Sequence, residues 1–160
     1  METEHLLKLA RRLIDELTFC VAVTQAEDGP DPSARIVQPL PIRDDWTVDV
    51  LTNRRCRKVR EIERTGRMTL LYQHDADKSY VTLAGSASVV EDRELKRAIW
   101  KPGHERWNPG GPEDPATVFA RLVPDRIELW SAVHGVLPEP KGYSAAVLLR
   151  DQGDWRYSTT

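Results

Sequence analysis

The segment from Thr52 to Arg60 concentrates positive charge where a strand is expected to give way to a helix. Its cations, five in seven residues, are Arg54, Arg55, Arg57, Lys58 and Arg60. The strand-like run 46–52 precedes them and the helix-like run 59–64 follows. A helix start presents unpaired backbone N–H groups and the positive end of the helix dipole, and arginine forms strong, directional hydrogen bonds with phosphate. These residue types at this spacing suit a phosphate dianion.

Charge alone allows three interpretations of this basic segment, residues 54–60. It can be a solvated helix face paired with Glu61 and Glu63, a phosphate site, or a contact for nucleic acid. The whole chain carries 23 Lys and Arg against 25 Asp and Glu, a net charge of −2, whereas a nucleic-acid-binding domain usually has a basic excess. We therefore expect no nucleic-acid partner. Cys56, inside the segment, is either a reactive thiol with a depressed pKa or simply a small residue near a helix start.

Several other chemical motifs are absent from the sequence. It has no GxGxxG dinucleotide fingerprint, no GxxxxGK[ST] phosphate loop and no GxSxG nucleophile elbow. Its four histidines lie in separate segments without metal-ligand spacing, so no metal site is predicted: they are His5, His74, His104 and His134. Asp75 and Asp77 flank a predicted turn and are interpreted as turn formers.

Apolar periodicity places the elements that must position the basic segment. Helices are predicted over 3–17, 56–65 and 91–100, with a further short helix over 114–122 that begins at Asp114-Pro115. Strands are predicted over 19–24, 35–38, 46–52, 67–73, 80–90 and 126–131, with two weaker candidates at 145–150 and 155–157. Gly85, in the middle of the long fifth strand, predicts a bulge. The Pro- and Gly-rich stretch 102–115 predicts a loop.

The short connections between most neighbouring strands favour a mainly β (α+β) fold. We expect a six-stranded antiparallel barrel with peripheral helices, formed by one domain over residues 1–160. No apolar run approaches the ~20 residues of a membrane helix, and the acidic N-terminus has no signal-peptide layout, so no membrane partner is expected. Cys20 and Cys56 form no CxxC pair, which predicts free thiols in a cytoplasmic protein.

The order of several short motifs resembles a known family. Arg35-Ile36-Val37 precedes a strand ending in Leu51-Thr52, and Arg57-Lys58 follows at the helix start. The run 80–87, with its central Gly85, and the run 124–130 complete the pattern. Together they resemble the pyridoxamine 5′-phosphate oxidase-like superfamily of flavin-binding split barrels. The Trp100 to Trp130 region is similar to its general stress protein 26 branch. The resemblance implies a Greek-key split barrel.

The resemblance also implies roles for residues of the basic segment. Arg57 and Lys58 would hold the phosphate of FMN. Cys56 stands where the family has a serine, which removes a hydroxyl donor. Leu51 and Thr52 match a pair that reaches the flavin through its backbone and hydroxyl group.

Further residues would contact the flavin ring. Arg35 matches the family's flavin-contacting arginine, and Ile36 and Val37 would lie along the isoalloxazine ring. Tyr80 stands where the family oxidase has glutamine, and Leu40 where it has lysine. Trp130 matches an aromatic residue that approaches the flavin from the other subunit of the family dimer, although ordinary core packing is the alternative for this side chain.

The function implied is that of a homodimer with FMN at the subunit interface. It would carry out flavin-dependent redox chemistry with a small-molecule substrate or a nicotinamide donor. The pyridoxamine phosphate oxidase itself is not expected, because residues 155–160 contain no Arg-x-His substrate motif; no catalytic residue is assigned. The alternatives are a non-catalytic flavin sensor or storage protein, and a split barrel that uses deazaflavin or haem.

Overall fold

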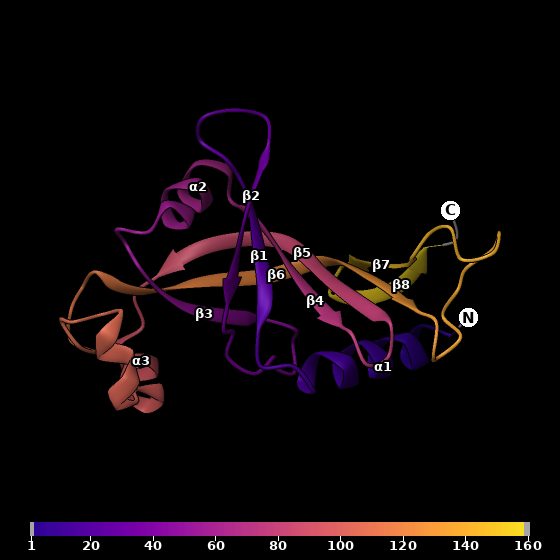
Figure 1. Ribbon diagram of the computed structural model, residues 1–160, viewed down its shortest axis with the longest axis horizontal. Helices are drawn as coiled ribbons and strands as arrows, with labels where there is room; N and C mark the ends of the chain where they lie inside the picture. Colours follow the sequence, from indigo (N-terminus) through magenta and orange to yellow (C-terminus); the bar gives the residue numbers. More distant parts are fainter. Residues whose placement is uncertain (1, 159–160) are drawn as a thin grey trace.

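The computed structural model describes residues 2–158, so the two ends of the predicted domain, Met1 and residues 159–160, lie outside the described part. The chain is mainly antiparallel β structure with three α-helices (Figure 1). The helices are α1 (Thr3–Asp15), α2 (Arg57–Thr65) and α3 (Arg93–Ile99). The strands are β1 (Cys20–Gln25), β2 (Pro32–Val37), β3 (Val48–Asn53), β4 (Arg67–His74), β5 (Ser79–Val90), β6 (Thr117–Ser131), β7 (Ala146–Asp151) and β8 (Asp154–Ser158).

The first six strands form the predicted barrel. Hydrogen bonding runs in the order β2-β1-β4-β5-β6, and β3 pairs with the first half of β6. An antiparallel bridge between Pro39 and Val50 joins the end of β2 to β3 and so closes the ring of strands. The β7–β8 hairpin extends the sheet from the second half of β6. It corresponds to the two weaker strand candidates near the C-terminus.

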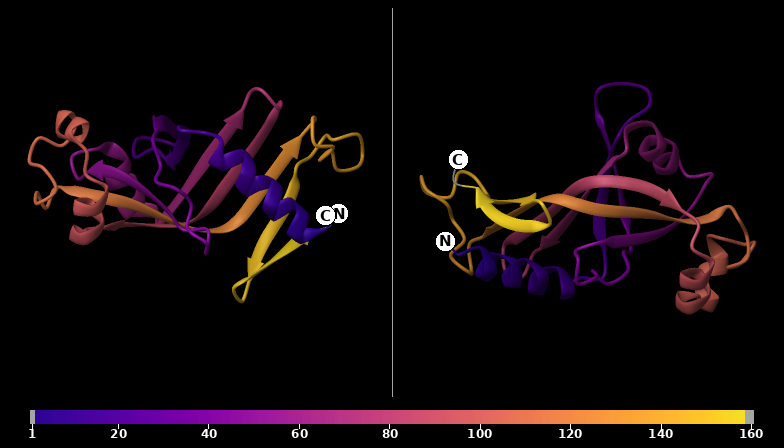
Figure 2. Two further views of the ribbon diagram at one scale, coloured as in Figure 1. Left: turned by 90° about the horizontal axis from the view of Figure 1, so that it is seen from below. Right: turned by 180° about the vertical axis from the view of Figure 1, so that it is seen from behind.

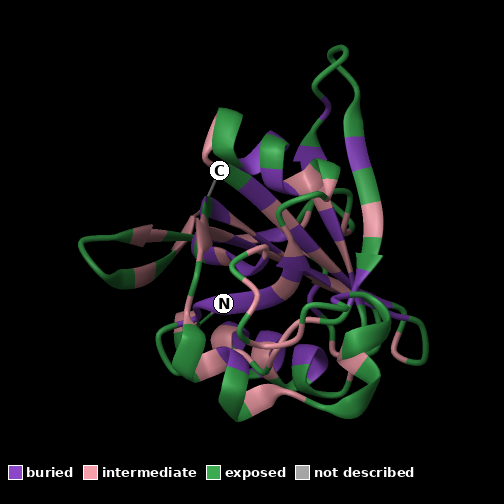
Figure 3. Cartoon of the chain, turned by 90° about the vertical axis from the view of Figure 1, so that its left-hand side faces the viewer, coloured by how far each residue is buried: buried purple, intermediate pink, exposed green. Residues whose placement is uncertain are grey.

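Helix α1 covers one side of the sheet because its apolar residues recur at helical spacing. Leu6, Leu9, Ala10, Leu13 and Ile14 are buried. The helix contacts β4, β5 and β8, and it runs beneath these strands in Figure 2. Figure 3 shows buried residues concentrated along the strands and exposed residues along the loops. No helix within residues 2–158 combines the length and the apolar composition needed to cross a membrane.

The predicted short helix over 114–122 is wrong. Residues 118–122 lie inside β6, between β3 on one side and β5 on the other. Asp114, expected to cap a helix, instead accepts a hydrogen bond from the backbone N–H of Ala116 at 2.9 Å, and the strand begins at Thr117. Pairing on both edges outweighs the local helix-start signal. The strand predicted over 126–131 is therefore the second half of a single 15-residue strand.

The predicted bulge at Gly85 is confirmed. The register of β5 against β6 shifts between Ala84 and Gly85. A Cβ atom at Gly85 would lie 2.2 Å from the Val123 carbonyl oxygen and 2.6 Å from the Pro124 Cα. Only glycine allows this close approach of the two backbones.

The predicted loop over 102–115 contains one short 3₁₀ turn, Pro102–Arg106. Lys96 of α3 fixes the end of this loop, although its side chain is fully buried. Its Nζ donates hydrogen bonds to the carbonyl oxygens of Asp114 at 3.0 Å and Thr117 at 2.9 Å. These contacts satisfy a buried amine that would otherwise be costly.

Candidate functional site

The strand-to-helix junction predicted at the basic segment is present. Strand β3 ends at Asn53, and α2 begins after Cys56, which is the N-cap residue. Val59 and Ile62 hold α2 against the barrel through buried side chains. No side chain caps the start of α2. The Val59 N–H donates to the Cys56 carbonyl at 3.1 Å, which leaves the N–H groups of Arg57 and Lys58 at the helix start for an anion.

Most cations of the basic segment have acidic partners. Three ion pairs form: Arg54 with Glu63 at 3.7 Å, Arg57 with Glu61 at 2.7 Å, and Arg60 with Glu27 at 3.0 Å. The paired-helix-face interpretation thus holds for part of the segment. Within residues 2–158, Arg55 and Lys58 have no carboxylate within 4.0 Å. Lys58 is partly buried; this burial lowers its pKa, an effect that Arg35 reinforces and Cys56 opposes.

A fully buried carboxylate, Glu61, lies between Arg35 and Arg57 and pairs with both. Its Oε1 pairs with Arg57 Nε at 2.7 Å. Its Oε2 accepts a hydrogen bond from the Thr24 hydroxyl at 2.6 Å and lies 3.5 Å from Arg35 Nη2. Burial alone would raise the pKa of Glu61, but the Thr24 hydrogen bond and the two arginines hold it below its usual value. Glu61 is therefore an anion in the folded protein.

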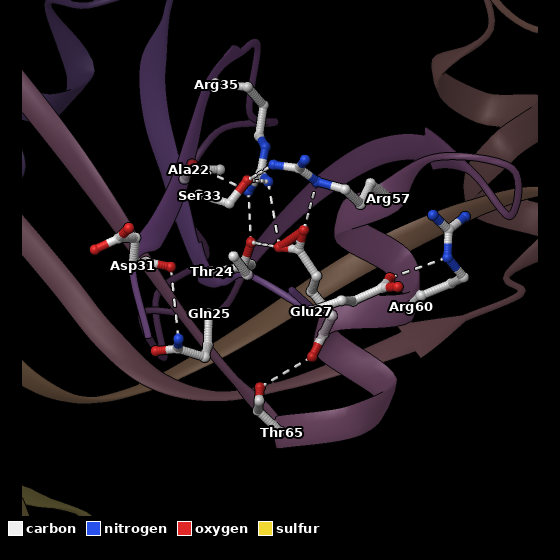
Figure 4. A network of polar contacts seen from close by, with 12 residues as sticks. Ala22, Thr24, Gln25, Glu27, Asp31, Ser33, Arg35, Arg57, Arg60 and Thr65 are labelled. Carbon is white, nitrogen blue, oxygen red and sulfur yellow. Dashed lines mark hydrogen bonds and ion pairs between the residues drawn. The ribbon is translucent and has the colours of Figure 1, made fainter. Parts of the chain in front are cut away.

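Arg35 is tied into the same group of residues; its predicted contact with the flavin stays a prediction. It donates hydrogen bonds to the Thr24 hydroxyl at 2.7 Å and to the Ala22 carbonyl at 3.3 Å. Ser33 lies between the two arginines, because its hydroxyl accepts from Arg35 Nη2 at 2.7 Å and also from Arg57 Nη2. The structure thus brings Arg35 and Arg57 together around one carboxylate. Figure 4 shows the four side chains Arg35, Arg57, Ser33 and Thr24 converging from β2, β1 and α2.

Thr52 contributes a polar atom that the protein leaves unsatisfied. The residue is 5% exposed, and its Oγ1 has no hydrogen-bond partner within residues 2–158. It lies beside the Cys56 thiol, whose pKa is raised by burial but lowered overall by Thr52 and by the charge of Lys58. A buried unsatisfied hydroxyl costs free energy unless a ligand or water completes it. The uncapped helix start, Lys58 and this hydroxyl therefore fit the phosphate end of FMN.

The residues predicted to lie along the flavin ring sit next to this group. Val37 is 8% exposed and packs in the barrel core, whereas Ile36 is 73% exposed on the opposite face of β2. Leu51 and Leu40 are partly buried. Leu40 donates its backbone N–H to Asp49 O at 2.8 Å, which holds it against β3. The side chains of Ile36 and Val37 point to opposite faces of the strand, so their joint contact with the ring stays a prediction.

Tyr80 and Trp130 form a second group at the far end of β5 and β6. They are cross-strand partners, and together with Tyr143 they line a pocket of about 760 Å³. Trp130 is partly buried, and its Nε1 donates a hydrogen bond to the Gly142 carbonyl at 2.8 Å. Leu51 pairs with Phe119, which pairs with Val90 at the other end of β5. Ten residues of strand therefore separate Tyr80 from the level of Leu51, about 30 Å along the strand.

A histidine–carboxylate cluster beside this pocket is not visible in the spacing of the sequence. His74 Nε2 lies 2.6 Å from Glu16, and His134 Nε2 lies 2.7 Å from Asp77. The His74 Nδ1 accepts the Asp77 backbone N–H at 3.3 Å, which assigns the proton to Nε2 and makes it a donor to Glu16. The pairs join residues 58 and 57 positions apart. Asp77 is thus more than a turn former.

Comparisons with known proteins agree with this architecture. The sequence model described as "Pyridoxamine 5'-phosphate oxidase like" matches residues 4–148. General stress protein 26 of Bacillus subtilis (strain 168) is 33% identical over 92 residues, which are 56% of this chain and 65% of that protein. This chain therefore aligns with slightly less than two thirds of its curated relative.

Solved structures share the fold. General stress protein 26 from Bacillus anthracis str. Sterne superposes with a TM-score of 0.67 at 28% identity, covering 78% of this chain and 93% of that one. A pyridoxamine 5′-phosphate oxidase-related, FMN binding protein from Nostoc punctiforme PCC 73102 superposes with a TM-score of 0.70 at 15% identity, covering 99% and 96%. The matched barrel and the family model over 4–148 lead to one conclusion: this chain belongs to the pyridoxamine 5′-phosphate oxidase-like family.

Proposed function

We propose that this protein binds FMN and uses it for redox chemistry on a small molecule. The observation that carries the proposal is the unsatisfied Thr52 hydroxyl beside Cys56, at a helix start without a side-chain cap. Membership of a generally flavin-binding family supports it. The Nostoc punctiforme neighbour, described as FMN-binding, shares the fold of this chain.

The phosphate would be held by Lys58, the first-turn N–H groups of α2 and Arg57. Lys58 has no acidic partner within residues 2–158, so its charge is available to a ligand. Arg57 already uses Nε and Nη2 on Glu61 and Ser33, which leaves Nη1 to meet a phosphate oxygen in a fixed orientation. The Thr52 hydroxyl would donate to the same phosphate, and the backbone of Leu51 would satisfy polar atoms of the flavin. When bound, the flavin supplies hydride and electron transfer.

The aromatic end of the barrel would complete the site of a second subunit. Tyr80 and Trp130 lie far along β5 and β6 from Thr52 of their own chain. Ile36, next to Arg35, is 73% exposed and apolar, which supports burial in an interface. A two-fold homodimer places the same surface of both chains in contact. The flavin would then lie between the Arg35 side of one chain and Trp130 of its partner.

The site favours a small molecule over nucleic acid. Three of the five cations in the basic segment are neutralised by neighbouring carboxylates, which weakens the field that a phosphate backbone needs. The free thiols Cys20 and Cys56 suit a reducing compartment, so we place the protein in the cytoplasm.

The test is a titration of the purified protein with FMN. We expect a yellow holoprotein, quenched flavin fluorescence and a melting temperature that rises with FMN concentration. A protein that neither binds FMN nor gains thermal stability from it would contradict the proposal. Deazaflavin and haem, titrated in the same way, serve as competing ligands.

Turnover is tested separately from binding. NADH or NADPH is mixed with the holoprotein, and flavin bleaching and steady-state oxidation are recorded. Turnover is expected for an oxidoreductase. Stable FMN binding without reduction by any donor would instead identify a flavin sensor or storage protein.

A further inference from the structure

Two cysteines of this chain lie in opposite chemical environments. Cys20 is 3% exposed in the barrel core, and burial raises the pKa of its thiol to about 12. Cys56 is partly exposed at the first position before α2, inside the basic segment. A positive helix start and nearby cations favour the thiolate form, which is the nucleophile. The chain therefore holds a reactive thiol and an inert one that serves as its internal control.

A second observation points to a group that would occupy the space at Cys56. The Thr52 hydroxyl is buried and has no oxygen or nitrogen partner within residues 2–158; its contact with the Cys56 sulfur helps to lower the pKa of that thiol. The α2 N-cap position is filled by Cys56, yet no side-chain hydrogen bond caps the helix. An oxygen atom attached to the Cys56 sulfur could accept from Thr52 and from the N–H of Lys58, as N-cap oxygens do. The helix start then gains a cap, and the Thr52 hydroxyl gains an oxygen acceptor.

We propose that Cys56 is a peroxide-sensing thiol whose oxidation blocks the anion-binding position at the start of α2. This position is formed by the free N–H groups of the helix start and the Thr52 hydroxyl. The Cys56 thiolate attacks hydrogen peroxide, a sulfur–oxygen bond forms, and the oxygen–oxygen bond breaks. Sulfur loses two electrons to give the sulfenic acid, and the released hydroxide takes a proton to become water. The added oxygen occupies the position that an anion would take.

The thiol chemistry does not depend on FMN. The consequence for cofactor loading rests on the proposed FMN function. In that case the oxidised side chain and the FMN phosphate compete for the same N–H groups and the same hydroxyl. Peroxide would then empty the site, and FMN already bound would shield the thiol.

The first experiment maps the oxidised cysteine. Apoprotein is treated with hydrogen peroxide near neutral pH in the presence of dimedone, and the sulfenic acid adduct is located by mass spectrometry. We expect the adduct on Cys56 to form at least ~100-fold faster than on Cys20, because a thiol with a pKa near 12 is almost wholly protonated at this pH. FMN should slow the labelling of Cys56. Equal labelling of both cysteines, or none on Cys56, would overturn the proposal.

The second experiment measures the consequence for binding. FMN affinity of the wild-type protein is compared before and after peroxide, with Cys56→Ser and Cys20→Ser treated in parallel. We expect at least a ~10-fold loss for wild type and for Cys20→Ser, and the same affinity before and after peroxide for Cys56→Ser. Unchanged FMN affinity of a protein fully oxidised at Cys56 would show that the oxidised side chain does not block the anion-binding position. If untreated wild type binds no FMN, the proposed function fails, whereas the labelling result still decides the reactivity of Cys56.

Discussion

The two ends of the barrel differ in what they offer a ligand. The α2 end offers charge: Lys58, the Arg57–Glu61–Arg35 group and a helix start without a side-chain cap. The β5–β6 end offers aromatic surface: Tyr80, Trp130 and Tyr143 around an open pocket. A flavin mononucleotide has a charged end and an aromatic end, and in one chain about 30 Å of strand separates these two regions. This separation is the reason for proposing a site shared between two copies of the chain.

The largest effect is expected from removing the charge at the α2 end. Arg57→Ala combined with Lys58→Ala should weaken FMN binding roughly 100- to 10,000-fold, because two charge-assisted contacts of about 1.5–3 kcal/mol each are lost. Arg60→Ala is the matched control, since the Arg60 guanidinium is already paired with Glu27, and it should cost less than about 3-fold. Fluorescence titration measures all three proteins. Equal losses of FMN affinity would mean that diffuse positive charge, and not a specific phosphate-binding site, attracts the ligand.

The buried carboxylate of the α2 end should matter most for stability. Glu61→Gln should lower the free energy of unfolding by about 2 kcal/mol, because Arg35 and Arg57 lose their common counter-ion. The folded-state pKa of Glu61 is depressed, so its contribution is present above the unfolded value and is lost as pH falls. The free energy of unfolding of the variant should therefore fall less steeply with decreasing pH than that of the wild-type protein. Urea unfolding between pH 3 and 7 measures this.

The matched control for this variant is Glu63→Gln. Glu63 pairs with Arg54 on an exposed surface, and such pairs contribute about 0–1 kcal/mol. Similar acid profiles for Glu61→Gln and the wild-type protein would show that Glu61 is not a structural anion.

Trp130→Ala should weaken FMN binding about 10-fold while leaving the preference for FMN over riboflavin unchanged, because it acts on the ring and not on the phosphate. Trp130→Phe should recover most of the affinity. A mixture of the Trp130→Ala protein with the Arg57→Ala/Lys58→Ala protein sharpens the comparison. If each site draws on both chains, mixed dimers contain one intact site and regain tight binding; mixtures that bind no better than either parent would place both ends of the flavin on one chain.

The smallest effect is expected at the histidine–carboxylate cluster beside the aromatic pocket. His134 holds the pKa of Asp77 below its usual value through a hydrogen bond. That contribution to stability is present above the unfolded pKa and fades as pH falls. Asp77→Asn should lower the melting temperature slightly at pH 7, less than Glu61→Gln does, with no change in FMN affinity. A marked loss of FMN affinity would connect this cluster to the ligand.

The sequence predicts the α2 end better than the β5–β6 end for a physical reason. Residues 52–61 are contiguous, so a strand end, a helix start and an i,i+4 pair such as Arg57–Glu61 follow from spacing alone. Glu61 also depends on Thr24 and Arg35, which only strand pairing brings near. The His74–Glu16 contact spans 58 positions and has no local signal.

The barrel strands were predictable because alternating burial leaves a period in the sequence. Residues 118–122 could not be predicted as a strand, because nearly all of their side chains are buried and the alternation of a strand is missing. The preceding Asp114-Pro115 is a typical helix start. The pairing of residues 118–122 with β3 and β5 is a property of the whole sheet. The same holds for the closing bridge between Pro39 and Val50.

The buried amine of Lys96 has a consequence for how this fold can change. Its Nζ donates hydrogen bonds to the backbone carbonyls of Asp114, just before β6, and of Thr117, the first residue of β6. The register of the longest strand is thereby set downstream of the Pro- and Gly-rich loop. Residues can be added to or removed from the loop tip without displacing the barrel. The exposed residues Glu105 to Trp107, which precede the buried Asn108, are thus the place where new sequence can be grafted or can diverge at little cost.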